Sequence, residues 1–406
     1  MKKNRFLALL LVLSMLLALA ACGGDPSADG TTAANTAASE TREQPEEAET
    51  TVPQPAADAP EISGLTFEAE TPLSYAQCFR LFRYEGGYTL IRIENGGDFL
   101  VVPENGTTPE GLSADITVLQ LPLNKIYLAA TSAMALFNAV GGIDAIRMTG
   151  IQASGWYVDA AVDALDSGKM LFAGKYSAPD YEMLIDEDCD LAIESTMIYH
   201  TPKVKEMIED LGIPVLVDRS SYEGHPLGRT EWVKLYAVLV GKEAEAESCF
   251  NEQAAVIQEL ESFENTGKSV AFFYVNSDGS VVIRKPTDYI PRMIHLAGGV
   301  YCFDDLQTDQ AATSISIDME TFYAAAADAD VLIYNASISA PITSTDELVE
   351  MNSLFADFKA VKEGNVWCTG KSFYQATDIV GQMIRDIHLA LTGGDPASMT
   401  FLSHVS

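Results

Sequence analysis

The sequence predicts an α/β protein built from two three-layer lobes that are joined by one long helix and preceded by an N-terminal β-hairpin. Short apolar runs alternate with segments of helical periodicity, the pattern of parallel strands covered by helices. This pattern occurs twice along the chain. Between the two series lies a long segment with one apolar helical face. With 406 residues, 48% of them hydrophobic, the chain is large enough for two cores.

The first 21 residues are typical of an export signal. Three cations within the first five residues precede an apolar run at residues 6–21, which suits a signal peptide better than a membrane span. The run ends in Ala20-Ala21-Cys22, which resembles the lipobox of bacterial lipoproteins. That resemblance implies that Cys22 is acylated and becomes the new N-terminus. We expect a lipid-anchored protein on the extracytoplasmic face of the cell membrane; a plain signal peptide or short anchor is the alternative.

Residues 22–66 are expected to form a disordered linker behind the lipid. They contain no aromatic residue and are rich in Ala, Thr, Glu and Pro, so they offer little to pack. Removal of residues 1–21 takes three positive charges from the formal net charge of −33, giving −36. Such an acidic protein is repelled by phosphate backbones, so we expect no nucleic-acid partner.

The first lobe is expected at residues 67–241. Strand-like residues 88–93 and 99–102 flank Asn95-Gly96-Gly97, a typical hairpin turn. Four further strands are expected from short apolar runs, at residues 125–128, 170–173, 190–193 and 213–217.

Residues 242–264 are expected to form the helix between the lobes. Phe250, Ala254, Ile257 and Leu260 share one helical face. The second lobe follows at residues 265–406, with strands expected at residues 269–275, 330–334 and 365–368. For residues 242–264, the alternative to a bridging helix is an ordinary surface helix that belongs to one lobe.

No motif for nucleotide binding or catalysis is complete. Residues 364–372 look like a phosphate loop, but five residues separate the glycines where that loop has four. The five histidines lack metal-ligand spacing. The five cysteines other than Cys22 are an odd set and cannot all pair within one chain. We therefore predict no catalytic residue, no metal site and no enzyme activity.

Two glutamates occupy matching places in the two lobes. Glu182 and Glu320 each lie in the first turn of a helix that leads to a strand. Acidic side chains there complement the helix dipole, which is a sufficient explanation without any partner. Glu182 lies eight residues before Asp190, whereas Glu320 lies ten before Asp330, so the second helix is expected to be two residues longer.

Several segments together resemble a known family. They are residues 125–150, 181–193, 211–215, 225–232, 294–299 and 319–334. They resemble the class III, helical-backbone substrate-binding proteins of ABC importers for ferric siderophores, haem and cobalamin, over residues 125–392. The resemblance implies that a ferric chelate, haem or corrinoid is carried as cargo, with no cofactor. It also implies a permease and its ATPase as partners, and docking of Glu182 and Glu320 into arginine pockets of the two permease subunits.

A cleft for such ligands needs aromatic walls and a few cations. Candidates in loops after strands are Trp156, Tyr157, Lys175, Tyr199, Arg284, Tyr289, Tyr334 and Tyr374. If the ligand is haem, Tyr199, His200 and His295 are the candidates for an axial atom. Each of these residues has an ordinary alternative as a packed aromatic or a solvated cation.

Two other functions remain open from the sequence. One is a lipid-anchored extracellular metal-dependent hydrolase, which would return an altered product where a carrier returns its ligand unchanged. The other is a surface module that adheres to neighbouring proteins, which would tolerate loss of the cleft aromatics.

Overall fold

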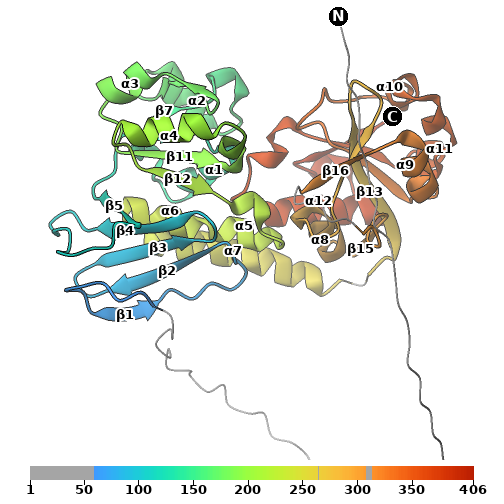
Figure 1. The fold of residues 1–406 in the computed structure, drawn as a ribbon. Coiled ribbons are helices and arrows are strands. Elements are labelled where there is room, and N and C mark those ends of the chain that lie inside the picture. The colour runs from blue at the N-terminus through green and yellow to red at the C-terminus, as the bar shows by residue number, and fades with distance from the viewer. Residues whose placement is uncertain (1–58, 264, 308–312) are drawn as a thin grey trace, which may run out of the picture. The chain divides into compact units, whose positions relative to one another are not determined.

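The computed structural model describes residues 59–263, 265–307 and 313–406 (Figure 1). The predicted signal peptide, Cys22 and most of the predicted linker lie outside the described residues. The described chain contains a five-stranded N-terminal sheet followed by two α/β lobes, each with its own sheet. This confirms the predicted fold class of two α/β lobes with an N-terminal β addition.

The N-terminal sheet contains the predicted hairpin and three further strands. Its order is β1-β2-β3-β4-β5, and all neighbours are antiparallel except β4 and β5. The end of the predicted linker packs against this sheet, because Ile62 is buried and the Tyr84 hydroxyl donates to the Pro60 carbonyl at 2.6 Å. The strands are β1 (Phe67–Glu70), β2 (Phe79–Tyr84), β3 (Tyr88–Ile93), β4 (Gly97–Val102) and β5 (Ile116–Gln120).

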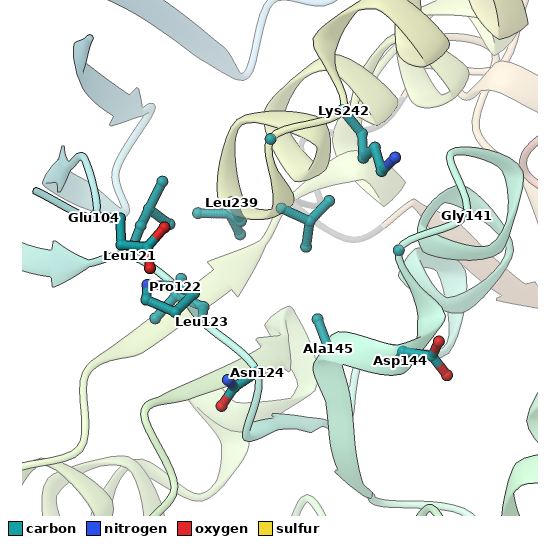
Figure 2. A pocket seen from close by; sticks show the side chains of 13 residues that line it. Glu104, Leu121, Pro122, Leu123, Asn124, Gly141, Asp144, Ala145, Leu239 and Lys242 are labelled. Atoms are coloured by element: carbon teal, nitrogen blue, oxygen red, sulfur yellow. The ribbon is translucent and has the colours of Figure 1, made fainter. Parts of the chain in front are cut away.

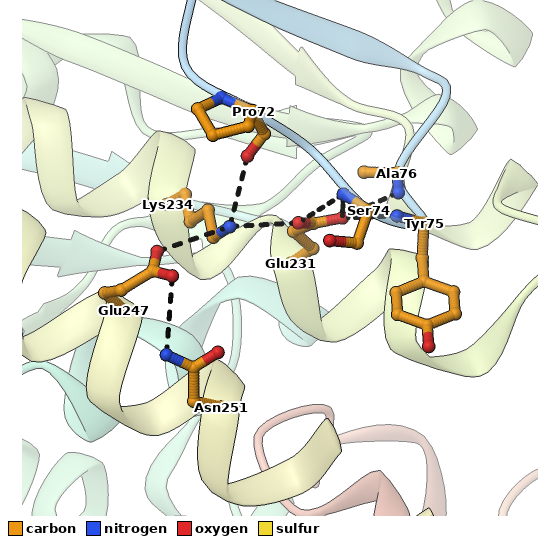
Figure 3. Close-up of polar contacts among 8 residues, drawn as sticks. All are labelled: Pro72, Ser74, Tyr75, Ala76, Glu231, Lys234, Glu247 and Asn251. Atoms are coloured by element: carbon orange, nitrogen blue, oxygen red, sulfur yellow. Dashed lines mark hydrogen bonds and ion pairs between the residues drawn. The ribbon is translucent and has the colours of Figure 1, made fainter. Parts of the chain in front are cut away.

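The loop between β1 and β2 attaches this sheet to the first lobe. Successive backbone N–H groups of residues 74–76 donate to the buried carboxylate of Glu231 at 2.8–3.1 Å. Lys234, also buried, pairs with Glu231 at 3.0 Å and with the exposed Glu247 at 3.3 Å (Figure 3). The donors compensate Glu231 for the loss of water, as a buried charge requires.

A second buried carboxylate continues this attachment. Glu223 accepts hydrogen bonds from the backbone N–H groups of Gln77 and Cys78 at 2.8 and 3.0 Å. It also accepts one from the indole N–H of Trp232 at 2.9 Å. The loop at residues 74–78 thus satisfies two acids that the first lobe buries; we call it the clamp loop.

The first lobe is a parallel sheet between two helical layers. Its order is β12-β11-β6-β7-β8. Along β11 (Leu191–Ser195), the first and third residues face one apolar cluster. Ala192 faces another cluster, which includes Leu184 of α3 (Tyr181–Asp186) and Ile208 of α4 (Pro202–Asp210). The two clusters on opposite faces define the three layers.

The elements of the first lobe follow in chain order. The strands are β6 (Ile126–Leu128), β7 (Ile146–Thr149), β8 (Leu171–Phe172), β11 (Leu191–Ser195) and β12 (Val215–Asp218), with a small pair β9 (Gly174–Lys175) and β10 (Ala178–Pro179). The helices are α1 (Thr131–Ala139), α2 (Asp159–Asp166), α3 (Tyr181–Asp186), α4 (Pro202–Asp210), α5 (Pro226–Glu231) and α6 (Val233–Val240).

Helix α7 (Glu243–Glu261) connects the lobes. Its 19 residues span about 28 Å at 1.5 Å per residue. It contacts α1, α5 and α6 of the first lobe and α8 (Tyr289–Leu296) and α12 (Val380–Thr392) of the second. Phe250, Ile257 and Leu260 are buried on its predicted apolar face. The prediction of a bridging helix is therefore confirmed.

The second lobe has a mixed sheet in the order β16-β14-β13-β17-β18-β19, with β15 paired to β13. Phe273 of β13 packs on Phe322 of α9 with ring centroids 4.7 Å apart, and Val270 faces the opposite layer. The strands are β13 (Lys268–Val275), β14 (Val281–Arg284), β15 (Gly299–Tyr301), β16 (Ser314–Ile317), β17 (Val331–Tyr334), β18 (Val366–Thr369) and β19 (Leu402–Val405). The helices are α8 (Tyr289–Leu296), α9 (Met319–Ala326), α10 (Thr345–Met351), α11 (Lys359–Glu363) and α12 (Val380–Thr392). Among the described helices, none has the length and apolarity needed to cross a membrane.

Candidate ligand-binding site

The parallel strands of both lobes end at the junction between the lobes. Gln375, in the loop after β18, contacts the loop after β7: its Nε2 donates to the Gly155 carbonyl and its Oε1 accepts from the Tyr157 N–H, both at 2.8 Å. Thr377 continues the contact, because its hydroxyl donates to the carbonyl of Ser132 at 2.5 Å. In α/β sheets, ligands bind at the carboxyl ends of parallel strands, so this junction is the candidate site.

Two pockets are lined by residues of both lobes. One, of about 390 Å³, lies between Tyr157 and Val158 of the first lobe and Ser372 and Ala376 of the second. The other, of about 110 Å³, has Tyr222 on one side and Lys285 with Asp288 on the other. Both pockets lie at the junction, where a ligand would touch both lobes.

Large apolar side chains are exposed in the loops at these strand ends. In the first lobe they are Tyr157, Met197, Tyr199 and Tyr222, which are 43–48% exposed. In the second lobe, Ile338 follows β17 and is 58% exposed. Exposed apolar side chains gathered at one edge indicate a binding surface more than a scattered set would.

Arg219 adds a cation to this edge. It directly follows β12, and its guanidinium lies 4.8 Å from the centre of the Tyr222 ring. Its Nε is buried and has no hydrogen-bond partner within the part of the chain that the structure describes. Arg219 as a whole is half-buried, so it places a cation at this edge of the sheet.

Three predicted ligand residues come together in the second lobe. Arg284 pairs with the buried Asp288 at 2.6 Å, and its guanidinium lies 5.8 Å from the Tyr289 ring. Burial is the largest single influence and disfavours the charge of Arg284, but the ion pair and hydrogen bond with Asp288, together with the nearby Tyr374 and Tyr289, outweigh it and raise the pKa of the arginine. Burial also raises the pKa of Tyr374, whose hydroxyl accepts a hydrogen bond from Asn335 at 2.8 Å. Arg284, Tyr289 and Tyr374 thus form one polar cluster behind the junction.

The remaining predicted ligand residues are dispersed. Trp156 is buried and donates to the Ile151 carbonyl at 3.2 Å, and Tyr334 is buried edge-on against Phe273. Lys175 is exposed on the β9–β10 pair. Only Tyr157 and Tyr199 present exposed rings among these candidates.

The histidines considered for haem lie apart. His200 is exposed at the end of the turn that contains Tyr199, whereas His295 is hydrogen-bonded to Asp304 at 2.8 Å. Within the described ranges, no group of three or more His, Cys, Asp and Glu side chains is arranged to hold a metal ion.

Sequence reasoning missed Arg219, Tyr222, Ile338 and Gln375 as site residues. Each lies in the first seven residues after a strand that the sequence did predict. A rule that inspects every loop after a parallel strand would have found them, since carboxyl ends of such strands share one edge.

The two predicted docking glutamates are exposed at equivalent positions. Asp180 caps α3 by accepting from the Met183 N–H at 3.0 Å, and Asp318 caps α9 by accepting from the Thr321 N–H at 2.7 Å. Glu182 and Glu320 are each the second residue of their helix. Helix α9 has eight residues and α3 has six, so the predicted two-residue difference falls at the far ends of the helices.

The fold has two α/β lobes that meet at a junction, and pockets there are lined by residues of both lobes. The sequence profile of the periplasmic binding protein family matches residues 129–372, more than half of the chain. The chain therefore belongs to the periplasmic binding protein family, which confirms the family expected from the sequence. The family consists of solute-binding proteins and not of enzymes.

Known relatives and structures agree with this assignment. Two uncharacterized lipoproteins of Methanocaldococcus jannaschii are each 26% identical, over 75% and 79% of this chain and 77% and 84% of their own lengths. The fold is similar to the petrobactin-binding protein of Bacillus subtilis (TM-score 0.54, 15% identity, 75% of this chain and 98% of that one). It is also similar to a periplasmic haem-binding protein of Vibrio cholerae (TM-score 0.53, 15% identity, 66% and 98%).

Proposed function

We propose that the chain is the binding lipoprotein of an ABC importer and carries a ferric siderophore, haem or cobalamin-type chelate at the lobe junction. One observation carries the proposal: exposed aromatic and apolar side chains, with cations beside them, gather where the parallel strands of both lobes end. Bulky, partly aromatic chelates need such walls. Anionic chelates also need cations at the site, because the protein as a whole is strongly negative and would repel them.

The proposed ligand site combines predicted and newly identified residues. Tyr157, Tyr199 and Tyr222 supply exposed rings, and Arg219 supplies a cation. The cluster of Arg284, Tyr289 and Tyr374 lies behind them. Arg284 holds the start of α8 in place through its ion pair with Asp288, the residue that caps this helix. Trp156 and Tyr334 contribute by packing and are left out of the proposed walls.

The proposed cycle has no chemical step. The protein binds its ligand, docks on a permease through Glu182 and Glu320, and releases the ligand when the partner ATPase works. Neither glutamate forms an ion pair within residues 59–263, 265–307 and 313–406, so both are available to arginines of a partner. Exposed contacts of this type contribute on the order of 1 kcal/mol each and act mainly on orientation and encounter rate.

Membrane attachment through acylated Cys22 is part of the proposal. It is supported by the lipobox-like residues and by the description of two relatives as lipoproteins. Replacing Cys22 with Ser should move the protein from the membrane fraction to the soluble extracytoplasmic fraction, as measured by fractionation and blotting. A Cys22→Ser protein that remains in the membrane fraction would contradict the lipid anchor.

Ligand titration tests the function directly. Tryptophan fluorescence of the purified protein should be quenched by one equivalent of a ferric hydroxamate, ferric catecholate, haemin or cobalamin, and the ligand should be recovered unchanged. Iron-free siderophores serve as controls. Failure of all four ligand classes to bind would overturn the proposal.

Import by cells tests the docking step. The double variant Glu182→Lys/Glu320→Lys should bind ligand normally and lose uptake. The matched control is Glu206→Lys/Glu350→Lys, which changes the charge equally at exposed positions of α4 and α10. Equal uptake by the two double variants would remove the docking role.

A further inference from the structure

A second kind of pocket, of about 410 Å³, is lined by the residues just before β6 (Figure 2). The candidate ligand site lies after the carboxyl ends of the strands, so this pocket is at the other edge of the sheet. Its apolar walls come from three segments: the connection between β5 and β6, the turn after α1, and the end of α6. They include Leu121, Pro122, Leu123, Ala145, Leu239 and Val240. Because the first of these segments precedes the family-matched residues 129–372, the N-terminal addition helps to form the pocket.

Two helices direct their carboxyl ends at this pocket. Helix α1 is followed by Gly141 and helix α6 by Gly241, and both glycines line the pocket with positive φ angles of 69° and 65°. A Cβ added at either glycine would meet nothing within 4 Å, so the backbone there faces open space. Helix ends of this kind carry partial negative charge, and neither helix has a basic residue in its last turn.

Side chains at the rim add to this negative potential. Glu104 and Asp144 line the pocket, are exposed, and form no ion pair within the residues that the structure describes. Among the described lining residues Lys242 is the one cation; it is half-exposed, pairs with Glu245 at 3.1 Å and lies at the amino end of α7, whose partial positive charge offsets part of the negative potential. Two carboxylates and two helix carboxyl ends still outweigh one lysine and one helix amino end. The pocket therefore combines apolar walls with an excess of negative charge.

We propose that this pocket binds a small organic cation, with its apolar body against the leucines and its ammonium group between the helix ends and the two rim carboxylates. An anion would be repelled by Glu104, Asp144 and both helix ends. A neutral apolar molecule would gain contact with the walls but no electrostatic stabilisation. The site is separate from the lobe junction, so it does not depend on which ligand the junction carries.

Three probes of one shape test the charge preference. They are 2-phenylethylamine, which is cationic at pH 7, 2-phenylethanol, which is neutral, and 3-phenylpropanoate, which is anionic. Calorimetry and saturation-transfer NMR on the full chain should show the amine binding about tenfold more tightly than the alcohol, because several weak attractions add. The acid should bind least, and added salt should reduce the advantage of the amine.

Variants of the lining residues locate the site. Glu104→Gln/Asp144→Asn should reduce amine affinity to near that of the alcohol, while the control Glu85→Gln/Asp115→Asn, which removes two exposed carboxylates outside the pocket, should leave it unchanged. Ala145→Trp should fill the pocket and remove binding of all three probes. Equal affinity of the three probes, absence of amine binding, or an unchanged amine affinity in the rim double variant would each overturn the proposal.

Discussion

The side chain of Gln375 accepts a hydrogen bond from the backbone N–H of Tyr157 across the lobe junction, at 2.8 Å. The same side chain donates to the Gly155 carbonyl, so one residue of the second lobe holds two backbone groups of the first. Both contacts lie beside the pocket that contains Tyr157. The relative position of the lobes is therefore coupled to the candidate ligand site.

Removing this side chain should loosen the junction. In Gln375→Ala, the Tyr157 amide should exchange hydrogen about fivefold faster, because a hydrogen bond contributes about 1 kcal/mol net. Hydrogen exchange with mass spectrometry measures this, and Gln307→Ala, at an exposed position of the second lobe, is the control. Unchanged exchange at residues 155–157 would show that Gln375 does not fix the loop.

The buried pair of Glu231 and Lys234 should be important for stability. Glu231→Gln leaves Lys234 buried without its closest anion, so the free energy of unfolding should fall by about 3–5 kcal/mol. The matched control is Glu247→Gln, which removes an exposed partner of the same lysine and should cost less than about 1 kcal/mol. Urea unfolding compares the two variants, and equal losses would contradict the role of the buried pair.

Glu194 should make stability depend on pH. Its side chain in β11 is fully buried, both oxygens lack partners within the described chain, and burial raises its pKa from 4.5 to about 8. Tyr127 and Tyr181 are the ionisable groups close to it, and both are neutral over this range. Between pH 4.5 and 8 the folded protein holds a proton that the unfolded chain has lost, so stability falls as pH rises.

The variant Glu194→Gln cannot titrate and should abolish this fall. It should match the parent near pH 4.5 and exceed it by a few kcal/mol above pH 8. Urea unfolding at pH 5, 7 and 9 measures the difference, with Glu206→Gln at an exposed position as control. A difference that does not grow with pH would mean that Glu194 is already ionised in the folded protein.

Arg219 should contribute to affinity for anionic ligands. Arg219→Gln should weaken binding of an anionic ferric chelate by roughly 10- to 100-fold, since a charge-assisted hydrogen bond contributes roughly 1.5–3 kcal/mol. Arg385→Gln, which removes an arginine paired with Glu259 elsewhere, is the control. Fluorescence titration at low and high salt measures the affinity of both variants and of the parent. If Arg219→Gln binds as tightly as the parent, other residues hold the anion.

Much of the fold could be predicted because its signals are local. The apolar runs at residues 190–193 and 330–334 became β11 and β17, and the apolar face of residues 242–264 became the buried side of α7. The five-stranded sheet was only partly predicted. In this sheet β4 pairs in parallel with β5, and a loop of 13 residues separates the two strands. A parallel pair of this kind has no local turn signal in the sequence.

The candidate site was harder to predict, because whether a residue lines it depends on the direction in which its side chain points. Tyr334 ends a correctly predicted strand, but its ring faces Phe273 in the core, and a shift of one residue would have turned it to the other face. Glu223 and Glu231 look like surface acids in the sequence. Their backbone donors lie about 150 residues away in the clamp loop, so no local pattern could show that they are buried.

The clamp loop also limits how far the chain can be shortened from its N-terminus. A shortened chain that starts at the family-matched residues would lack the N–H groups of residues 74–78 while keeping Glu223 and Glu231. Two carboxylates would then lie in an apolar interior with most of their donors gone, and such a fragment should aggregate. The N-terminal sheet is thus a structural requirement of the binding domain, and the shortest foldable unit is larger than the region that defines the family.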